Sequence, residues 1–196
     1  TQPDPDHGDI VAAAITADVQ PTESEVAVVV LWLNSERAKR RNARKLRTHA
    51  ATWLRRVLQP REHEQPDQLT WKLRFTIDCR EEGTRKDPWP LLFEMRLRVM
   101  LRQWKEALSV APSISLKGCH QVVVSEVVSM VTRCHVELEQ WAEAEKWVRE
   151  CLKSKRGGES KELRYWLSVA IARQATQSGS RLNSESLEAL LGTLSG

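Results

Sequence analysis

Residues 103–107 read Gln-Trp-Lys-Glu-Ala, and residues 140–144 read Gln-Trp-Ala-Glu-Ala, 37 positions further along the chain. Each copy follows a stretch with apolar residues at helical spacing and opens a second such stretch. An aromatic residue that seals a turn, followed by an Ala that lets two helices approach closely, is typical of stacked helical hairpins. This internal repeat therefore predicts an all-α array of helical hairpins.

Helical periodicity extends outward from both copies of the motif. A capping box, Thr22 with Glu25 three residues later, predicts a further helix start. The Val-rich run 26–33 after it leaves a buried strand as the alternative to a helix. Counted together, the patterns predict about eight helices and no convincing strand. After the segment that the capping box opens, the helical segments are 36–59, 67–83, 91–102, 104–111, 121–138, 141–151, 162–174 and 184–194.

The two copies resemble the turn and second-helix start of tetratricopeptide-type repeats. Trp104 and Trp141 stand where that family places an aromatic at the turn, and Ala107 and Ala144 match its close-contact Ala. The resemblance covers about residues 91–153, a third of the chain. It implies a helical-repeat fold and a function in binding other molecules.

The chain also departs from the family pattern. The small residue of the family's first helix is replaced by Met95 and Thr132, and the Pro that ends each repeat is missing at Cys119 and Arg156. The offset of 37 residues exceeds the usual 34 of the family. The resemblance therefore implies the hairpin architecture and carries over no carboxylate-clamp residues.

The chain has 196 residues, enough for one core or for about three hairpins. Pro3, Pro5 and Gly8 predict a flexible N-terminal arm over residues 1–21, followed by one helical repeat domain over 22–196. The longest apolar run has eight residues, far below the ~20 that span a bilayer. We therefore expect no transmembrane segment in this chain.

The four Cys form no CxxC pair and lie inside apolar-periodic segments. This pattern favours buried, reduced thiols and an intracellular protein, cytoplasmic or nuclear, over a disulfide framework. Cys119-His120 and Cys134-His135 suggest zinc, but 15 residues of continuous helix would separate the pairs by about 22 Å. We expect no metal ion and no cofactor.

No Gly-rich phosphate loop, nucleophile elbow or HExxH motif is present. The acidic residues between 137 and 145 are typical of a solvated helix face, and no catalytic residue is indicated. The sequence therefore predicts that the protein is not an enzyme.

A basic ridge follows the predicted helix at 36–59. Three interpretations remain open: a solvated face, a docking site for an acidic protein, or a contact to phosphates in DNA, RNA or anionic lipid. The dominance of Arg over Lys favours bidentate recognition of carboxylate or phosphate. The ridge consists of Arg37, Arg40, Arg41, Arg44, Lys45, Arg47, Arg55 and Arg56.

Most of the eight Trp fall in helical patterns and are expected in the core. Trp89, between two Pro residues, is the candidate for an exposed anchor. Since the aromatic and basic residues occupy different stripes, stacking on single-stranded bases is disfavoured. The sequence therefore predicts a protein–protein interaction scaffold or adaptor, a subunit of a larger complex with an acidic or helical partner. The alternative is a nucleic-acid-binding subunit that uses the basic ridge.

Overall fold

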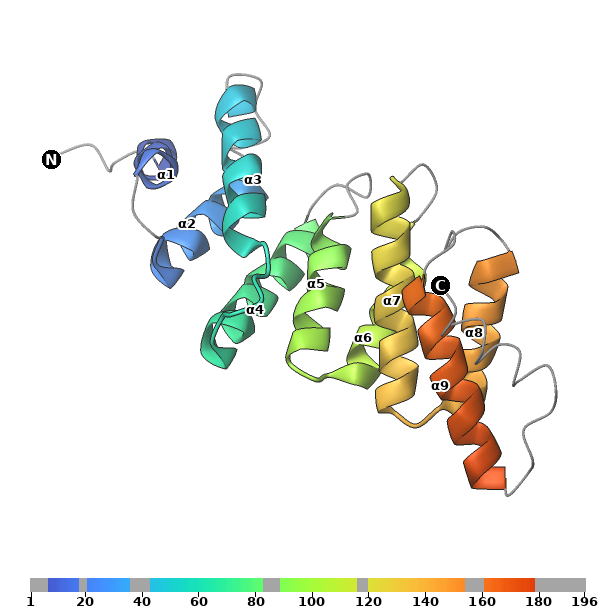
Figure 1. Cartoon of the computed structure of the whole chain (residues 1–196). Coiled ribbons are helices and arrows are strands. Elements are labelled where there is room, and N and C mark those ends of the chain that lie inside the picture. The colour runs from blue at the N-terminus through green and yellow to red at the C-terminus, as the bar shows by residue number, and fades with distance from the viewer. Residues whose placement is uncertain are drawn as a thin grey trace, which may run out of the picture. The chain divides into compact units, whose positions relative to one another are not determined.

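A computed structural model describes residues 7–17, 21–35, 43–82, 89–115, 120–153 and 161–178. Within these ranges the ordered elements are nine α-helices and one short 3-10 helix, with no strand, which confirms the all-α prediction (Figure 1). The predicted helix at 184–194 lies outside the described residues. The elements are α1 (His7–Thr16), α2 (Glu23–Asn34), α3 (Arg44–Leu58), α4 (Pro66–Glu82), α5 (Trp89–Met100), α6 (Trp104–Val110), η2 (Ala111–Ser113), α7 (Gln121–Glu137), α8 (Trp141–Lys153) and α9 (Lys161–Ser178).

The chain forms two compact units, Thr1–Leu97 and Arg98–Gly196, where the sequence predicted one domain over 22–196. The boundary falls inside α5. Each unit has an apolar cluster of its own. The division was missed because the spacing of apolar residues along one helix does not reveal which of the two clusters those residues join.

The first unit is built on contacts of α1 with α2 and α3, of α2 with α3 and α4, and of α3 with α4. Its core joins Val and Trp side chains of α2 to the inner face of α3 and to aromatic residues of α4 and α5. Residues 7–16, expected in a flexible arm, form α1 instead. That expectation is wrong here because Val11 is fully buried in this core.

The Val-rich run of α2 is helical, so the strand alternative is wrong. Its start is fixed by the predicted capping box. The Glu25 N–H donates to Thr22 Oγ1 (3.3 Å), and the Thr22 N–H donates to Glu25 Oε2 (2.7 Å). The Thr22 hydroxyl also donates to Glu25 Oε2 (2.9 Å), and the bonds that the Thr22 N–H and hydroxyl donate to this carboxylate lower the pKa of Glu25. Satisfied N-terminal amides outweigh the modest β preference of Val.

In the second unit α7 packs against α6, α8 and α9, and α8 packs against α9 (Figure 1). Val124 and Val128 of α7 and Val148 of α8 meet Leu163 and Leu167 of α9 in its core. Helical hairpins thus bury their apolar stripes against one another.

The two copies of the motif form the same turn. Arg102 and Glu139, the residues before each Gln, have φ of 58° and 56°. In each turn the following Gln donates its N–H to the carbonyl five residues back, at 2.8 Å for Gln103 to Arg98 and 2.9 Å for Gln140 to His135. This bond, with one from the left-handed residue to the carbonyl three residues back, is the Schellman arrangement that ends a helix.

Side chains repeat in the two turns as well. Arg98 Nη1 donates to Gln103 Oε1 (3.3 Å), and His135 Nδ1 lies 2.9 Å from Gln140 Oε1. Ala107 and Ala144, one turn into the next helix, are both fully buried. The internal repeat of the sequence is therefore also a repeat of backbone conformation and side-chain contacts.

Candidate partner-binding surface on α3

The helix α3 has one apolar face and one basic face. Ala50, Trp53, Leu54 and Leu58 are buried in the core of the first unit. The helix contains no acidic residue, while Arg44, Lys45, Arg47, Arg55 and Arg56 give it five positive charges. Burial of the apolar stripe therefore fixes the basic residues toward the other faces of the helix.

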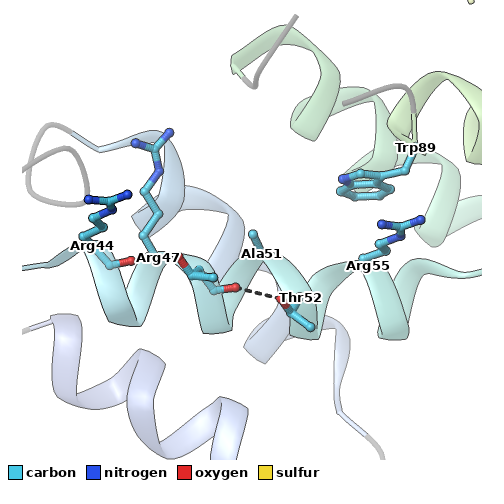
Figure 2. Close-up of a pocket in the computed structure, with 7 residues that line it drawn as sticks. Arg44, Arg47, Ala51, Thr52, Arg55 and Trp89 are labelled. Atoms are coloured by element: carbon cyan, nitrogen blue, oxygen red, sulfur yellow. Dashed lines mark hydrogen bonds between the residues drawn. The ribbon is translucent and has the colours of Figure 1, made fainter. Parts of the chain in front are cut away.

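A surface hollow of about 440 Å³ runs along the basic face. Figure 2 shows Arg44 and Arg47 at one end and Arg55 beside Trp89 at the other, with Ala51 and Thr52 between them. Eleven residues of helix separate Arg44 from Arg55, or about 16 Å at 1.5 Å per residue. The hollow is lined by Arg44, Arg47, Thr48, Ala51, Thr52, Arg55 and Trp89.

Short side chains make the middle of the hollow shallow. Thr48 Oγ1 donates to the Arg44 carbonyl (3.0 Å), and Thr52 Oγ1 donates to the Thr48 carbonyl (2.9 Å). Both hydroxyl protons are thus used within the helix, so the Thr oxygens offer a partner acceptors only. The Arg guanidinium groups are the strong donors of this surface.

The cations of α3 have no carboxylate partner among the described residues. Other Arg residues there do form ion pairs: Arg74 with Glu23, Arg80 with Glu94, Arg133 with Glu137, and Arg149 with Glu145. The α3 face therefore keeps its positive potential, which attracts anionic partners.

Five of the eight predicted ridge residues lie within the described part of the chain. Arg44, Arg47 and Arg55 line the α3 hollow together. Lys45 is exposed and does not line it, and Arg56 lines a second hollow. The other three, Arg37, Arg40 and Arg41, lie outside the described residues.

Trp89 is not an exposed anchor, so this prediction is wrong. Its exposed fraction is 9%, and it belongs to the core of the first unit. The indole packs edge-on against Phe93, with ring centroids 5.2 Å apart. Trp89 is the first residue of α5, so the helix carries its side chain into the same cluster as Phe93 one turn later.

Sequence reasoning missed a second hollow, of about 260 Å³, between the end of α3 and the start of α4. Its residues come from α3, the linker after it, α4 and Pro21 before α2, and no periodic pattern links them. The one available signal was a pair of Trp residues flanking the linker between these helices. The lining consists of Pro21, Trp53, Arg56, Val57, Arg61, Glu64, Gln68, Trp71 and Lys72.

The repeat residues of the second unit have a packing role. Trp104 and Trp141 are half-buried at the starts of α6 and α8. The Arg133 guanidinium lies 5.6 Å from the centre of the Trp104 ring, a cation–π contact between α7 and α6. These contacts support the hairpin turns.

Two of the cysteines have thiols that stay protonated at neutral pH. Burial raises the pKa of Cys79 to about 12 and that of Cys134 to about 11. Within the described ranges, no three His, Cys, Asp or Glu side chains gather as metal ligands would. In the same ranges no helix is long and apolar enough to cross a membrane.

Comparison of the chain with protein-family models, with curated proteins and with solved structures gave no match. The surface chemistry of α3 is therefore the principal basis for assigning a function.

Proposed function

We propose that the chain is a non-enzymatic protein–protein interaction scaffold or adaptor, a subunit of a larger intracellular complex. In this proposal the partner protein has an acidic segment, which lies along the α3 hollow. The observation that carries this proposal is a helix with five cations and no acidic residue, whose charges meet no carboxylate in the described part of the chain.

Arg44 and Arg47 at one end and Arg55 at the other present guanidinium groups about 16 Å apart. Each fork of N–H donors matches a carboxylate, so two separated acidic clusters on one segment fit both ends together. The short side chains at Thr48, Ala51 and Thr52 leave room for the backbone of that segment between them.

A partner protein fits the α3 hollow better than single-stranded nucleic acid. Base recognition needs aromatic faces open to stacking beside the basic groups. The indoles next to the row of Arg on α3, those of Trp89 and Trp53, have exposed fractions of 9% and 6%. Contacts to phosphates alone are the alternative. Comparing the binding of an acidic peptide with that of oligonucleotides distinguishes the two.

We also propose that the two hairpins joined by the turns at 102 and 139 are repeats of the tetratricopeptide-like type. The shared left-handed residue, the shared Gln contact and the buried Ala support this proposal. Repeats of this kind stack in arrays that bind other proteins, which agrees with the scaffold function.

The test replaces three cations on each of two helices, so that both variants lose the same net charge. One variant is Arg44→Gln, Arg47→Gln and Arg55→Gln on α3. The matched control on α8 is Lys146→Gln, Arg149→Gln and Lys153→Gln. The probe is a labelled 12-residue peptide with two Glu pairs, measured by fluorescence anisotropy against a single-stranded and a double-stranded oligonucleotide.

We expect the α3 variant to lose about tenfold in peptide affinity, since three exposed charge pairs are worth ~0.2–1 kcal/mol each. The α8 control should stay close to the wild-type affinity. Equal losses in both variants would contradict the acidic-partner proposal. Preferential binding of either oligonucleotide, lost steeply with salt, would reassign the α3 face to phosphate recognition.

A further inference from the structure

The second hollow combines aromatic walls with a buried ion pair. Trp53 has an exposed fraction of 6%, Trp71 is half-buried, and both line it together with Val57 of α3. The ammonium of Lys72 forms an ion pair with Glu64 inside the hollow, and the two side chains are only 7% and 12% exposed. A ligand here would meet flat apolar surface and a desolvated charge at the same time.

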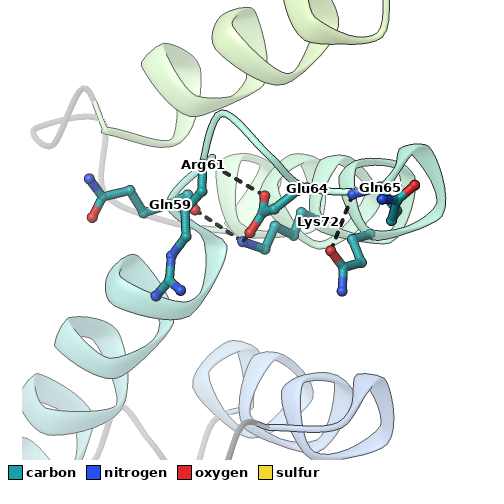
Figure 3. Close-up of polar contacts among 6 residues, drawn as sticks. Gln59, Arg61, Glu64, Gln65 and Lys72 are labelled. Carbon is teal, nitrogen blue, oxygen red and sulfur yellow. Dashed lines mark hydrogen bonds and ion pairs between the residues drawn. The ribbon is translucent and has the colours of Figure 1, made fainter.

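The acceptors lining this hollow are already engaged (Figure 3). Glu64 Oε1 accepts from Lys72, and Glu64 Oε2 accepts from the Arg61 N–H (3.2 Å). Gln68 Oε1 accepts from the Gln65 N–H (3.3 Å). The carboxylate and amide oxygens that line the hollow are thus each occupied by a donor of the protein itself.

The donors lining the hollow are in excess. Lys72 Nζ donates to Glu64 and to the Gln59 carbonyl (3.0 Å), which uses two of its three N–H groups. The guanidinium groups of Arg56 and Arg61 and the amide NH₂ of Gln68 meet no acceptor in the described part of the chain. Three cations against one carboxylate leave the lining with a net positive charge.

We infer that this second hollow is a binding site for a small organic anion, a carboxylate attached to a flat apolar body. The apolar body lies between Trp53 and Trp71, and the carboxylate accepts hydrogen bonds from Lys72, Arg56 and Arg61. The volume of about 260 Å³ lies just below the 300–1,000 Å³ of pockets that enclose drug-sized ligands. The site therefore admits one residue or one small acid.

Two sources supply this chemistry: a free aromatic or aliphatic acid, and the C-terminal residue of a peptide with its free carboxylate. The inference does not depend on the proposed partner site, because Lys72, Arg61 and the two Trp residues do not line the α3 hollow. Each proposal fails or holds on its own variants.

The experiment titrates the full ¹⁵N-labelled chain with three probes of one shape. These are phenylacetate, the uncharged phenylacetamide and the cationic phenethylamine. The readout is the indole N–H resonances of Trp53 and Trp71, assigned with Trp53→Phe and Trp71→Phe. We expect phenylacetate to shift both resonances with a millimolar Kd, as befits a ligand of about ten non-hydrogen atoms, and phenylacetamide to bind about tenfold more weakly.

Charge variants identify the carboxylate contacts. Arg56→Gln with Arg61→Gln should weaken phenylacetate about tenfold, since both side chains are exposed and their replacement leaves the core intact. The matched control, Lys146→Gln with Lys153→Gln, removes two exposed charges that line neither hollow and should change the affinity by less than about twofold. Lys72→Met is a second variant, for use where its thermal unfolding shows that the chain folds.

Acetyl-Gly-Phe with a free or an amidated C-terminus distinguishes the two sources. Tighter binding of the free acid than of phenylacetate assigns the site to a peptide C-terminus, and weaker binding assigns it to a free acid. The inference is overturned where the three phenyl probes bind alike. It is equally overturned where phenylacetate shifts neither indole at about 50 mM, well above the expected Kd.

Discussion

The helices α3 and α8 both bury an apolar stripe, but they differ in the signs of the charged side chains on their outer faces. Both bury one stripe, through Leu54 and its neighbours in α3 and through Val148 and its neighbours in α8. The outer face of α3 carries five cations and no acid. The outer face of α8 carries three of each sign: Lys146, Arg149 and Lys153 against Glu143, Glu145 and Glu150.

The difference separates a helix face whose charges are partly paired from one whose charges have no carboxylate partner among the described residues. On α8, Arg149 Nε lies 2.8 Å from Glu145 Oε1, one turn away, so the helix neutralises part of its own charge. On α3 no such pair exists among the described residues, and the like charges repel one another. Because these positive charges are not neutralised, the surface of α3 attracts anions.

The largest expected effect is on the free energy of unfolding and comes from the buried apolar side chains of the clusters that the two helices join. Leu54 of α3 and Leu163 of α9, which packs in the same cluster as Val148 of α8, are each 1% exposed. Leu54→Ala and Leu163→Ala should each lower the free energy of unfolding by ~2–5 kcal/mol, measured by urea denaturation. Leu31→Ala, at a site 71% exposed, should change it by less than ~0.5 kcal/mol. A neutral Leu54→Ala would show that α3 is not anchored in a core.

A second prediction compares one thiol from each unit. With pKa values of about 12 for Cys79 and about 11 for Cys134, against an ordinary 9.0, the thiolate at pH 8 is about a thousandfold and about a hundredfold scarcer than in a free Cys. Burial is the main cause for both, and the Asp78 charge adds to the shift at Cys79. Alkylation of the native chain with iodoacetamide, followed by mass spectrometry, should therefore be slow at both positions and fast in denaturant.

The same thiols impose a pH dependence. Their pKa values are raised in the folded chain, so above pH 9 the unfolded chain releases protons that the native chain retains. The contribution of these two thiols to stability should be constant below pH 9 and fall between pH 9 and about 12. Cys79→Ala with Cys134→Ala should flatten this decline. Rapid native labelling at pH 8 would contradict the burial of these side chains.

The smallest expected effect on stability comes from adding an acidic residue to α3 and removing a paired cation from α8. Ala51→Glu places a carboxylate four residues after Arg47 and four before Arg55, and each such pair is worth about 0.2–0.5 kcal/mol. The free energy of unfolding should stay equal or rise by a few tenths of a kcal/mol, while the affinity for the acidic peptide should fall about threefold to fivefold. Arg149→Ala on α8 should lower the free energy of unfolding by a similar amount and leave peptide binding intact. A loss of peptide binding in both variants would remove the distinction between the two helices.

Local sequence patterns predicted the features that depend on a few neighbouring residues. The capping box at Thr22, the helix boundaries on both sides of the two motifs, and the burial of Ala107 and Ala144 all follow from short-range spacing. The grouping of Arg44, Arg47 and Arg55 on one side of α3 follows from the helical period. Whether the hairpins belong to the tetratricopeptide type stays a prediction.

Features that depend on contacts between distant segments were missed. The burial of Val11 turned an expected arm into α1, and the cluster with Phe93 buried Trp89. The second hollow needs Lys72 and Glu64, neither of which follows an amphipathic pattern.

The sequence by itself determined that the chain is helical, where the two motif turns fall, and that α3 is rich in cations, because these properties arise from hydrogen bonds, composition and side-chain spacing within a few turns. Only the tertiary structure decided the division into two units, the burial of Trp89, and the excess of donors in the second hollow. The physical reason is that burial and hydrogen-bond pairing are properties of a site assembled from several segments, and each segment alone is compatible with many partners.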